Sequence, residues 1–437
     1  MRKKILKTHR VCAASLICIL VGAVLSGCGT AASKSELSTK DVDLRISWWG
    51  GDLRHERTQK AIDAFEKKYP NIHVTGEFAD WGGYWDKLAT STAGGSSPDV
   101  IQLDQLYLAS YAERGTLLDL NTLDRLDKKH YDPAILDSGR SKGTLYAMPI
   151  SSTIASIAVN QTLLDELGLK LPDTNVWTWS GLEKFSLLVN QKSGGTVRGF
   201  GLLTGEYSLR IYARQHGEEL FAKGKMSISP KVLAGYLEQN KKWTESGVAS
   251  SAGAFSETSA LPVDQSPFAT KKQAMMFLPG PQTAALIAAT GGAHIIPVKL
   301  PTGDANKAAY AYAKPGMYWG VSSQSKHSAE ASLLVNFLVN SPTAFKSIGT
   351  ERGISANPEV RASLISSLTP DDKVAFDYIT AMTKHLGKAP EIVPNGASEI
   401  DKILQRYLLE VLFGKQSAKE AASGMIDDVQ KSIDAAK

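Results

Sequence analysis

Residues 43–78, DLRISWWGGDLRHERTQKAIDAFEKKYPNIHVTGEF, contain the pattern from which the fold is inferred. Apolar and polar side chains alternate over 43–49, which predicts a strand. Residues 57–69 then place apolar side chains at helical spacing, and Pro70 ends the predicted helix. Alternation returns over 71–78. Strand, helix and strand in this order, joined by short turns, predict a mostly parallel sheet covered by helices.

The pattern changes further along the chain. An extended run over 145–160, rich in serine and containing Pro149, predicts a crossing between two lobes, and the length of 437 residues agrees with two domains. Residues 249–267 have the composition of a loop. Helical spacing predicts further helices at 84–93, 107–114, 161–168, 180–191, 230–246, 329–339, 371–384, 399–413 and 418–436. The C-terminal region is therefore expected to be helical.

The N-terminal segment has the features of an export signal. Five basic residues and no acidic ones precede the uncharged apolar run 11–25. As a helix, about 15 residues rise roughly 22 Å, which is short of the ~30 Å hydrocarbon core of a membrane. A signal peptide over 1–27 is thus favoured over a membrane-spanning anchor. The run ends in Leu25-Ser26-Gly27-Cys28, which resembles the lipobox of bacterial lipoproteins.

This motif leads to an expectation about localisation. Cys28 is expected to carry the lipid, with palmitate among its acyl chains, and residues 28–40 to form a small, polar tether. The protein would then be held at the cell membrane on its extracytoplasmic face. Cys12, Cys18 and Cys28 are the three cysteines of the sequence, so the body of the protein has no disulfide.

The charge distribution argues against a nucleic-acid partner. The chain has 49 basic and 44 acidic residues, a net charge of +5. Because the five excess positive charges lie in residues 1–10, the rest of the chain is neutral. We therefore predict no binding of nucleic acid.

Motifs for catalysis lack the context that their chemistry needs. Residues 139–143, GRSKG, match the hydrolase pattern G-x-S-x-G, but extended residues follow where a helix is required, so we interpret them as a turn before a strand. His55-Glu56 lacks the second histidine of a zinc-binding helix. We predict no catalytic residue, no metal and no cofactor. An exported glycoside hydrolase stays an alternative, because sequence cannot show paired carboxylates; a lipid-anchored adhesion protein is a third.

Several tryptophans stand beside glycines at the ends of predicted strands. Because successive side chains of a strand point to opposite faces, Trp48 is expected to face the core and Trp49 to face a cleft. Trp81 and Trp319 also lie next to glycines, either as pocket walls or as core residues. Such rings offer flat apolar faces to the C–H faces of a sugar. Packing in the core is the favoured interpretation for Trp85, Trp179 and Trp243.

The order and spacing of several segments resemble the family 1 extracellular solute-binding proteins of bacterial sugar ABC importers. The resemblance covers residues 41–437, and the segments that carry it are 46–74, 81–104, 111–120, 143–164, 275–282 and 315–342. The opening WWGGDLRH is most similar to the branch that includes oligogalacturonide-binding and related oligosaccharide-binding proteins. The resemblance implies a periplasmic-binding-protein-like fold, α/β, with two hinged lobes that each hold a mostly parallel sheet.

The resemblance also implies boundaries and a function. An N-terminal lobe over 41–152 would be completed by about 293–345, and a C-terminal lobe over 153–292 by about 346–437. A monomer would capture a carbohydrate, with an oligosaccharide as the expected ligand, between the lobes. It would deliver that ligand to ABC permease subunits in the membrane, which work with a cytoplasmic ATPase.

Positions that match the family predict the ligand contacts. They are Trp49, Asp52, Arg54, Asp80, Trp81, Asp104, Gln105, Tyr107, Gln282 and Trp319. Arg54 and Arg352 either are solvated surface residues or bind the carboxylate of a uronic acid. The family's maltose binder has a tryptophan and an acid-base pair where this chain has Leu103, Leu106 and Tyr107. This departure argues against maltose as the ligand.

Overall fold

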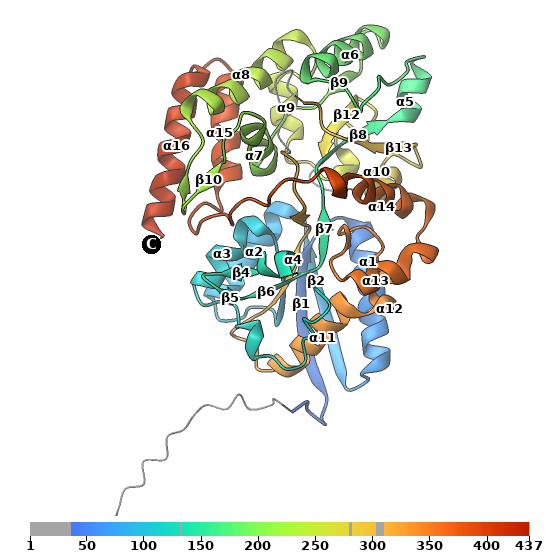
Figure 1. Cartoon of the computed structure of the whole chain (residues 1–437), viewed down its shortest axis with the longest axis vertical. Helices are drawn as coiled ribbons and strands as arrows, with labels where there is room; N and C mark the ends of the chain where they lie inside the picture. The colour runs from blue at the N-terminus through green and yellow to red at the C-terminus, as the bar shows by residue number, and fades with distance from the viewer. Residues whose placement is uncertain (1–35, 132, 279–281, 303–309, 437) are drawn as a thin grey trace, which may run out of the picture. The chain divides into compact units, whose positions relative to one another are not determined.

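The structure is a computed structural model that describes residues 36–131, 133–278, 282–302 and 310–436 (Figure 1). The predicted signal peptide, the predicted lipidation site at Cys28 and the predicted tether up to residue 35 lie outside the described residues. Residues 36–40 form neither helix nor strand. Among the helices described, none combines the length and the apolar composition needed to cross a membrane.

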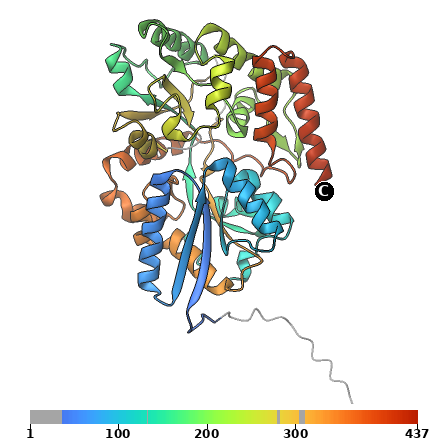
Figure 2. The ribbon, with the colours of Figure 1, turned by 180° about the vertical axis from the view of Figure 1, so that it is seen from behind.

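A five-stranded sheet forms the first lobe, in the order β2-β1-β3-β15-β6. Its strands are β1 (Val42–Trp49), β2 (Ile72–Ala79), β3 (Val100–Leu103), β6 (Ala147–Pro149) and β15 (Tyr318–Val321). β1 is parallel to both of its neighbours, as predicted, whereas β15 runs antiparallel to β3 and β6. Figure 2 shows the two blue strands of the β1–β2 pair side by side.

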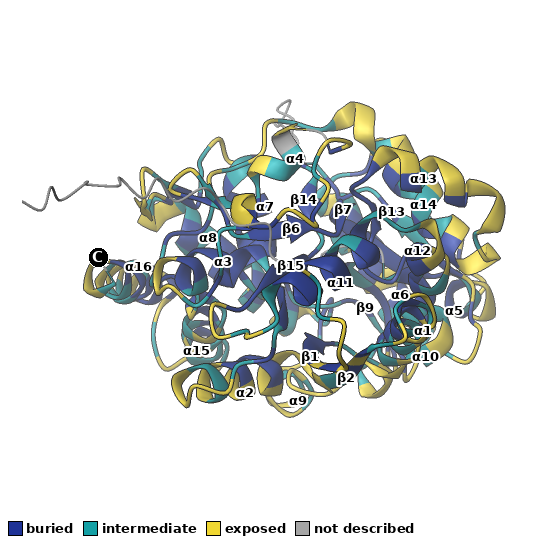
Figure 3. Ribbon diagram, turned by 90° about the horizontal axis from the view of Figure 1, so that it is seen from below, coloured by how far each residue is buried: buried dark blue, intermediate teal, exposed yellow. Residues whose placement is uncertain are grey.

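The first helix covers this sheet because its apolar stripe matches the inward face of β1. α1 (Asp52–Lys68) buries Ala61, Ile62 and Phe65. Leu44, Ile46 and Trp48 are fully buried on β1. The other helices of the lobe are α2 (Trp81–Ala93), α3 (Gln105–Glu113), α4 (Pro133–Asp137), α11 (Ser328–Asn340), α12 (Pro342–Ile348) and α13 (Pro358–Leu364). Figure 3 shows α11 buried along almost its whole length, while α13 is largely exposed.

A four-stranded sheet forms the second lobe, in the order β13-β8-β12-β9. Its strands are β8 (Ser156–Asn160), β9 (Arg198–Phe200), β12 (Gln273–Leu278) and β13 (Ile295–Val298). Its helices are α5 (Gln161–Glu166), α6 (Trp179–Lys192), α7 (Glu206–Gln215), α8 (Pro230–Ser246), α9 (Ala252–Thr258), α10 (Thr283–Ala289), α14 (Pro370–Met382), α15 (Ile400–Leu412) and α16 (Ala418–Ala435). β8 runs antiparallel to β12 and β13.

Each sheet thus has one strand that opposes the others, and the remaining strands are parallel, which agrees with the mostly parallel sheets that were predicted. β15 and β8 oppose their neighbours because each follows a connection between the lobes and therefore runs away from it. That connection is a three-stranded sheet of β14 (Lys314–Pro315), β7 (Ser151–Thr153) and β16 (Ile354–Ser355).

Two lobe boundaries lie at other positions in the structure than predicted. Residues from about 293 were expected in the first lobe, but β13 pairs with β8 in the second sheet. Residues from about 346 were expected in the second lobe, but α12 packs on α1 and α13 packs on α12. The chain crosses between the lobes through β7 and β14, and it crosses to the second lobe again only after α13, before α14 packs on α10 and β13.

Short elements complete the chain. β4 (Arg140–Ser141) and β5 (Thr144–Leu145) form a hairpin, which confirms the turn predicted for residues 139–143. A second hairpin joins β10 (Phe221–Ala222) to β11 (Lys225–Met226). Single-turn helices are η1 (Leu120–Thr122), η2 (Val263–Gln265), η3 (Ile365–Ser367) and η4 (Thr383–His385).

Glycine is required at residue 353, where the three connecting strands pack closely. A Cβ there would lie 2.5 Å from Thr153 Cγ2 and 2.8 Å from the Ser152 carbonyl oxygen, at a φ of +95°. We expect Gly353→Ala to lower the free energy of unfolding by about 3 kcal/mol in urea titrations, from overpacking and backbone strain. Gly217→Ala is the matched control, since its φ is +78° with no atom within 4 Å; it should cost about 1 kcal/mol. Equal costs would contradict the packing argument.

Candidate functional site

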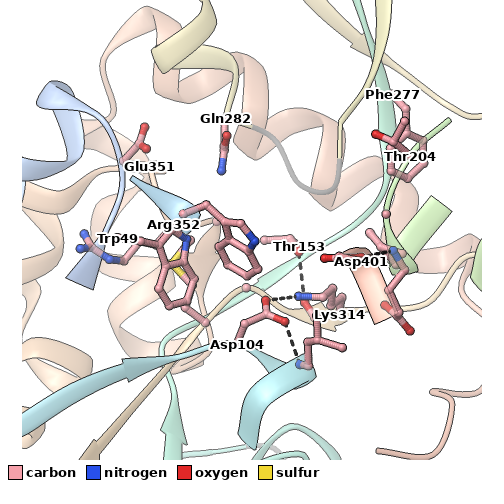
Figure 4. A pocket seen from close by; sticks show the side chains of 18 residues that line it. Trp49, Asp104, Thr153, Thr204, Phe277, Gln282, Lys314, Glu351, Arg352 and Asp401 are labelled. Carbon is pink, nitrogen blue, oxygen red and sulfur yellow. Dashed lines mark hydrogen bonds and ion pairs between the residues drawn. The ribbon is translucent and has the colours of Figure 1, made fainter. Parts of the chain in front are cut away.

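A pocket of about 270 Å³ lies where residues from both sheets and the connecting strands meet (Figure 4). From the first lobe it is lined by Trp49, Trp81, Asp104 and Leu106. Thr153, Lys314, Gly316, Met317, Glu351, Arg352 and Gly353 line it in and beside the connecting strands. The second lobe contributes Thr204, Gly205, Glu206, Tyr207, Phe277, Gln282 and Asp401.

Aromatic rings form two walls of this pocket. Trp49 and Trp81 meet edge to face, with ring centroids 5.0 Å apart. Behind them, Trp85 stacks on Tyr107 with ring centroids 3.6 Å apart. Trp85 also packs against the indoles of Trp49 and Trp81 and supports them. The second lobe places Tyr207 and Phe277 as another edge-to-face pair.

Asp104 and Lys314 form the polar floor, and Figure 4 shows them pointing toward one another. Lys314 Nζ lies 2.7 Å from Asp104 Oδ2, and both side chains are almost buried. Asp104 follows β3 directly, and its Oδ1 accepts a hydrogen bond from the Leu106 backbone N–H at the start of α3. The carboxylate is therefore fixed in position and its charge is already balanced.

Two arginines beside the pocket are engaged by the protein itself. Arg54 donates from Nε to Glu351 Oε1 and from Nη1 to the Trp49 carbonyl. Arg352 donates to Gln102 Oε1 and Thr58 Oγ1 and lies over the Trp319 ring. Burial, together with the nearby Arg54 charge, holds the pKa of the Arg352 guanidinium well below its usual range.

Asp401 lies in the first turn of α15 and lines the same pocket. Its Oδ1 accepts a hydrogen bond of 2.6 Å from the Glu206 backbone N–H. Burial, together with the charges of Glu206 and Asp104, raises the pKa of Asp401 to about 7, against the opposing effects of that hydrogen bond and of Lys314. Glu206 itself is paired with Arg210 one turn along α7.

The raised pKa of Asp401 predicts a pH-dependent stability. The folded protein keeps a proton that the unfolded chain loses above its ordinary pKa of 3.8, so stability should decrease as the pH rises from about 4 to about 7 and then level off. From pH 5 to pH 8 this group should lower the free energy of unfolding by roughly 2.5 kcal/mol. Asp401→Asn keeps an oxygen acceptor for Glu206 and should remove that part of the decrease in urea unfolding. An unchanged pH profile in the variant would contradict the assignment.

Five residues predicted from the sequence line the pocket: Trp49, Trp81, Asp104, Gln282 and Arg352. Six others do not line it: Asp52, Arg54, Asp80, Gln105, Tyr107 and Trp319. Trp319 is fully buried because alternation along β15 turns it into the interior, beneath Arg352.

The other predicted ligand contacts that do not line the pocket have structural positions or lie at the surface. Asp52 is exposed at the start of α1. Asp80 caps α2 by accepting the Gly83 backbone N–H. Gln105 is buried, and Tyr107 supports Trp85.

Sequence reasoning missed most of the polar and second-lobe lining. The clearest omissions are Glu206, Tyr207, Phe277, Lys314, Glu351 and Asp401. Phe277 lies in a segment that carries the family resemblance, but Asp401 and Glu206 lie in stretches without a motif. In the part of the chain that the structure describes, no three histidine, cysteine or acidic side chains gather as a metal site.

Comparison with known proteins gives a family match. The family model described as bacterial extracellular solute-binding protein matches residues 52–344. A carbohydrate ABC transporter substrate-binding protein of Streptococcus pneumoniae is 24% identical over 44% of this chain and 40% of its own length. The melibiose/raffinose/stachyose-binding protein of Bacillus subtilis is 26% identical over 41% of this chain and 40% of its own length. These alignments therefore span less than half of either relative.

Solved structures show the fold more completely. An oligogalacturonide-binding protein of Yersinia enterocolitica, solved with saturated digalacturonic acid, aligns with a TM-score of 0.79. The alignment covers 91% of this chain and all of that chain, at 23% identity. The likeness establishes the two-lobed periplasmic-binding-protein fold that the sequence predicted.

Proposed function

Because the chain belongs to the bacterial extracellular solute-binding proteins, we propose that it is the substrate-binding component of an ABC importer for a carbohydrate. It captures the sugar in the pocket between its two sheets and delivers it to permease subunits in a membrane. The names of its relatives in Streptococcus and Bacillus support a carbohydrate ligand.

The observation that carries this proposal is a pocket with aromatic walls and an internally balanced polar floor. Trp49 and Trp81 from one lobe and Phe277 from the other can stack on the apolar faces of sugar rings. Gln282 and the Asp104–Lys314 pair can bind hydroxyls.

Contacts from both lobes provide the mechanism. A ligand shifts an equilibrium between open and closed lobes only by its difference in affinity for the two states. A sugar that touches Trp81 and Phe277 together gains its full set of contacts only when the lobes are closed around it. The closed, loaded form is then the one that the permease recognises.

A panel of neutral and uronate oligosaccharides tests this function. Thermal unfolding is measured with each sugar, and hits are titrated by calorimetry. At a hundred times Kd the right sugar should stabilise the protein by about 2.7 kcal/mol. The absence of any response across a broad panel would contradict the proposal.

One observation favours a glycoside hydrolase as the second candidate: a carboxyl group with a pKa near 7, Asp401, is what a general acid needs. The other lining carboxylates, Asp104, Glu206 and Glu351, are each paired with a basic side chain. We therefore favour a binder without catalysis. Incubating the panel hit with the protein should release no shorter sugar; a product that disappears in Asp401→Asn would favour the enzyme.

We further propose that the protein is a monomer anchored to the membrane through a lipid on Cys28. The sequence Leu25-Ser26-Gly27-Cys28 supports this anchor. Cys28→Ser should move the protein from the membrane fraction to the soluble fraction. Retention of the variant in the membrane fraction would contradict lipid anchoring at this residue.

A further inference from the structure

Asp401 differs from the other carboxylates that line the pocket. Among the described residues, Asp104 is bonded to Lys314, Glu206 to Arg210 and Glu351 to Arg54. Asp401 instead receives a single backbone N–H, from Glu206, on Oδ1. The residue is partly buried and lines the pocket, so a ligand in the pocket can reach it.

The charges around Asp401 favour its neutral form. Glu206 on α7 and Asp104 at the start of α3 both oppose a further negative charge. Lys314 on β14 is the nearby cation that favours ionisation, but it is already held by Asp104. Beyond these, Arg210 is engaged by Glu206, and the phenols of Tyr107 on α3 and Tyr236 on α8 interact electrostatically with Asp401.

A neutral carboxylic acid at this position has chemistry that a carboxylate lacks. It both donates and accepts a hydrogen bond, as a sugar hydroxyl does. We propose, on the basis of the proposed function, that Asp401 binds a saccharide hydroxyl as a neutral carboxylic acid, so that the protein takes up its sugar together with a proton. The proton comes from solvent whenever Asp401 is ionised before binding, and it returns to solvent when the sugar leaves.

Ligand binding should further favour the neutral form of Asp401. A sugar that fills the pocket displaces water from the accessible side of Asp401, and loss of water disfavours the ionised form further. A neutral sugar therefore binds the protonated protein more tightly. By linkage, affinity is constant at low pH and falls as the pH rises through the pKa of the free protein.

Calorimetry tests the proposal with the neutral oligosaccharide that gives the largest thermal shift in the panel. Affinity of the wild type should fall about fivefold from pH 6 to pH 8. At pH 7, titrations in two buffers of different ionisation enthalpy should show uptake of a fraction of a proton per sugar bound. Asp401→Asn, which donates and accepts without titrating, should bind with the same affinity at both pH values and take up no proton. Asp371→Asn, an exposed position on α14, should behave as the wild type.

The outcomes separate this inference from the function on which it rests. A wild type that binds no sugar at any pH contradicts the proposed function. A wild type that binds without proton uptake, or an Asp401→Asn variant that keeps the pH dependence, overturns the role of Asp401 and leaves the function standing. If the variant does not fold, proton uptake by the wild type at pH 7 decides alone.

Discussion

We expect Arg54→Met to lower the free energy of unfolding by about 3–5 kcal/mol, a large effect for one substitution. Arg54 is only 3% exposed, and its guanidinium is bonded to Glu351 and to the Trp49 carbonyl. Removing it leaves the Glu351 carboxylate buried without its partner, which is more costly than the loss of the ion pair itself. Urea unfolding measures the effect.

Two controls make this expectation specific. Arg54→Met combined with Glu351→Gln should recover much of the loss, because no buried charge then lacks a partner. Lys60→Met removes an ion pair of 2.6 Å with Glu56 on the same helix, but both of those side chains are well exposed; its cost should be below about 0.5 kcal/mol. If Arg54→Met left stability unchanged and abolished binding of uronates alone, Arg54 would be the ligand contact that the sequence suggested.

The second large effect is expected at Trp81. Trp81→Ala should weaken saccharide binding by about 2 kcal/mol, or roughly 30-fold, because a ring at the centre of a binding site commonly supplies this much. Its side chain is 38% exposed, so its removal should disturb folding little. Calorimetric titration measures the affinity.

Phe78→Ala is the matched control for that variant. Phe78 is 42% exposed, lies in the same lobe and stacks on His55, but it does not line the pocket. Its affinity for sugar should equal that of the wild type. An equal loss of affinity in both variants would show that Trp81 acts through the fold of the lobe and not through contact with the ligand.

Local patterns predicted the fold well where one face of an element is buried. Strand alternation and helical spacing over 43–78 correspond to β1, α1 and β2. α7 was missed because nearly every one of its residues is buried, so that it shows no polar face to reveal its period. α9 lies in a stretch predicted as a loop, and none of its residues is buried.

The site was harder to predict than the fold because it is assembled from distant segments. Trp49 and Trp81 could be found because a ring beside glycines at a strand end is a local signal. Arg54 was predicted as a ligand contact from the family resemblance, yet its bond to Glu351, 297 residues away, holds it in the interior. Asp401 meets Glu206 across 195 residues, and no spacing in the sequence indicates that contact.

The central claim is that one saccharide is bound by both lobes at once. Calorimetric titration of the panel hit against two single variants tests it most directly: Trp81→Ala in the first lobe and Phe277→Ala in the second. We predict that each variant binds the sugar at least about tenfold more weakly than the wild type. Full affinity in either variant would contradict binding between the lobes.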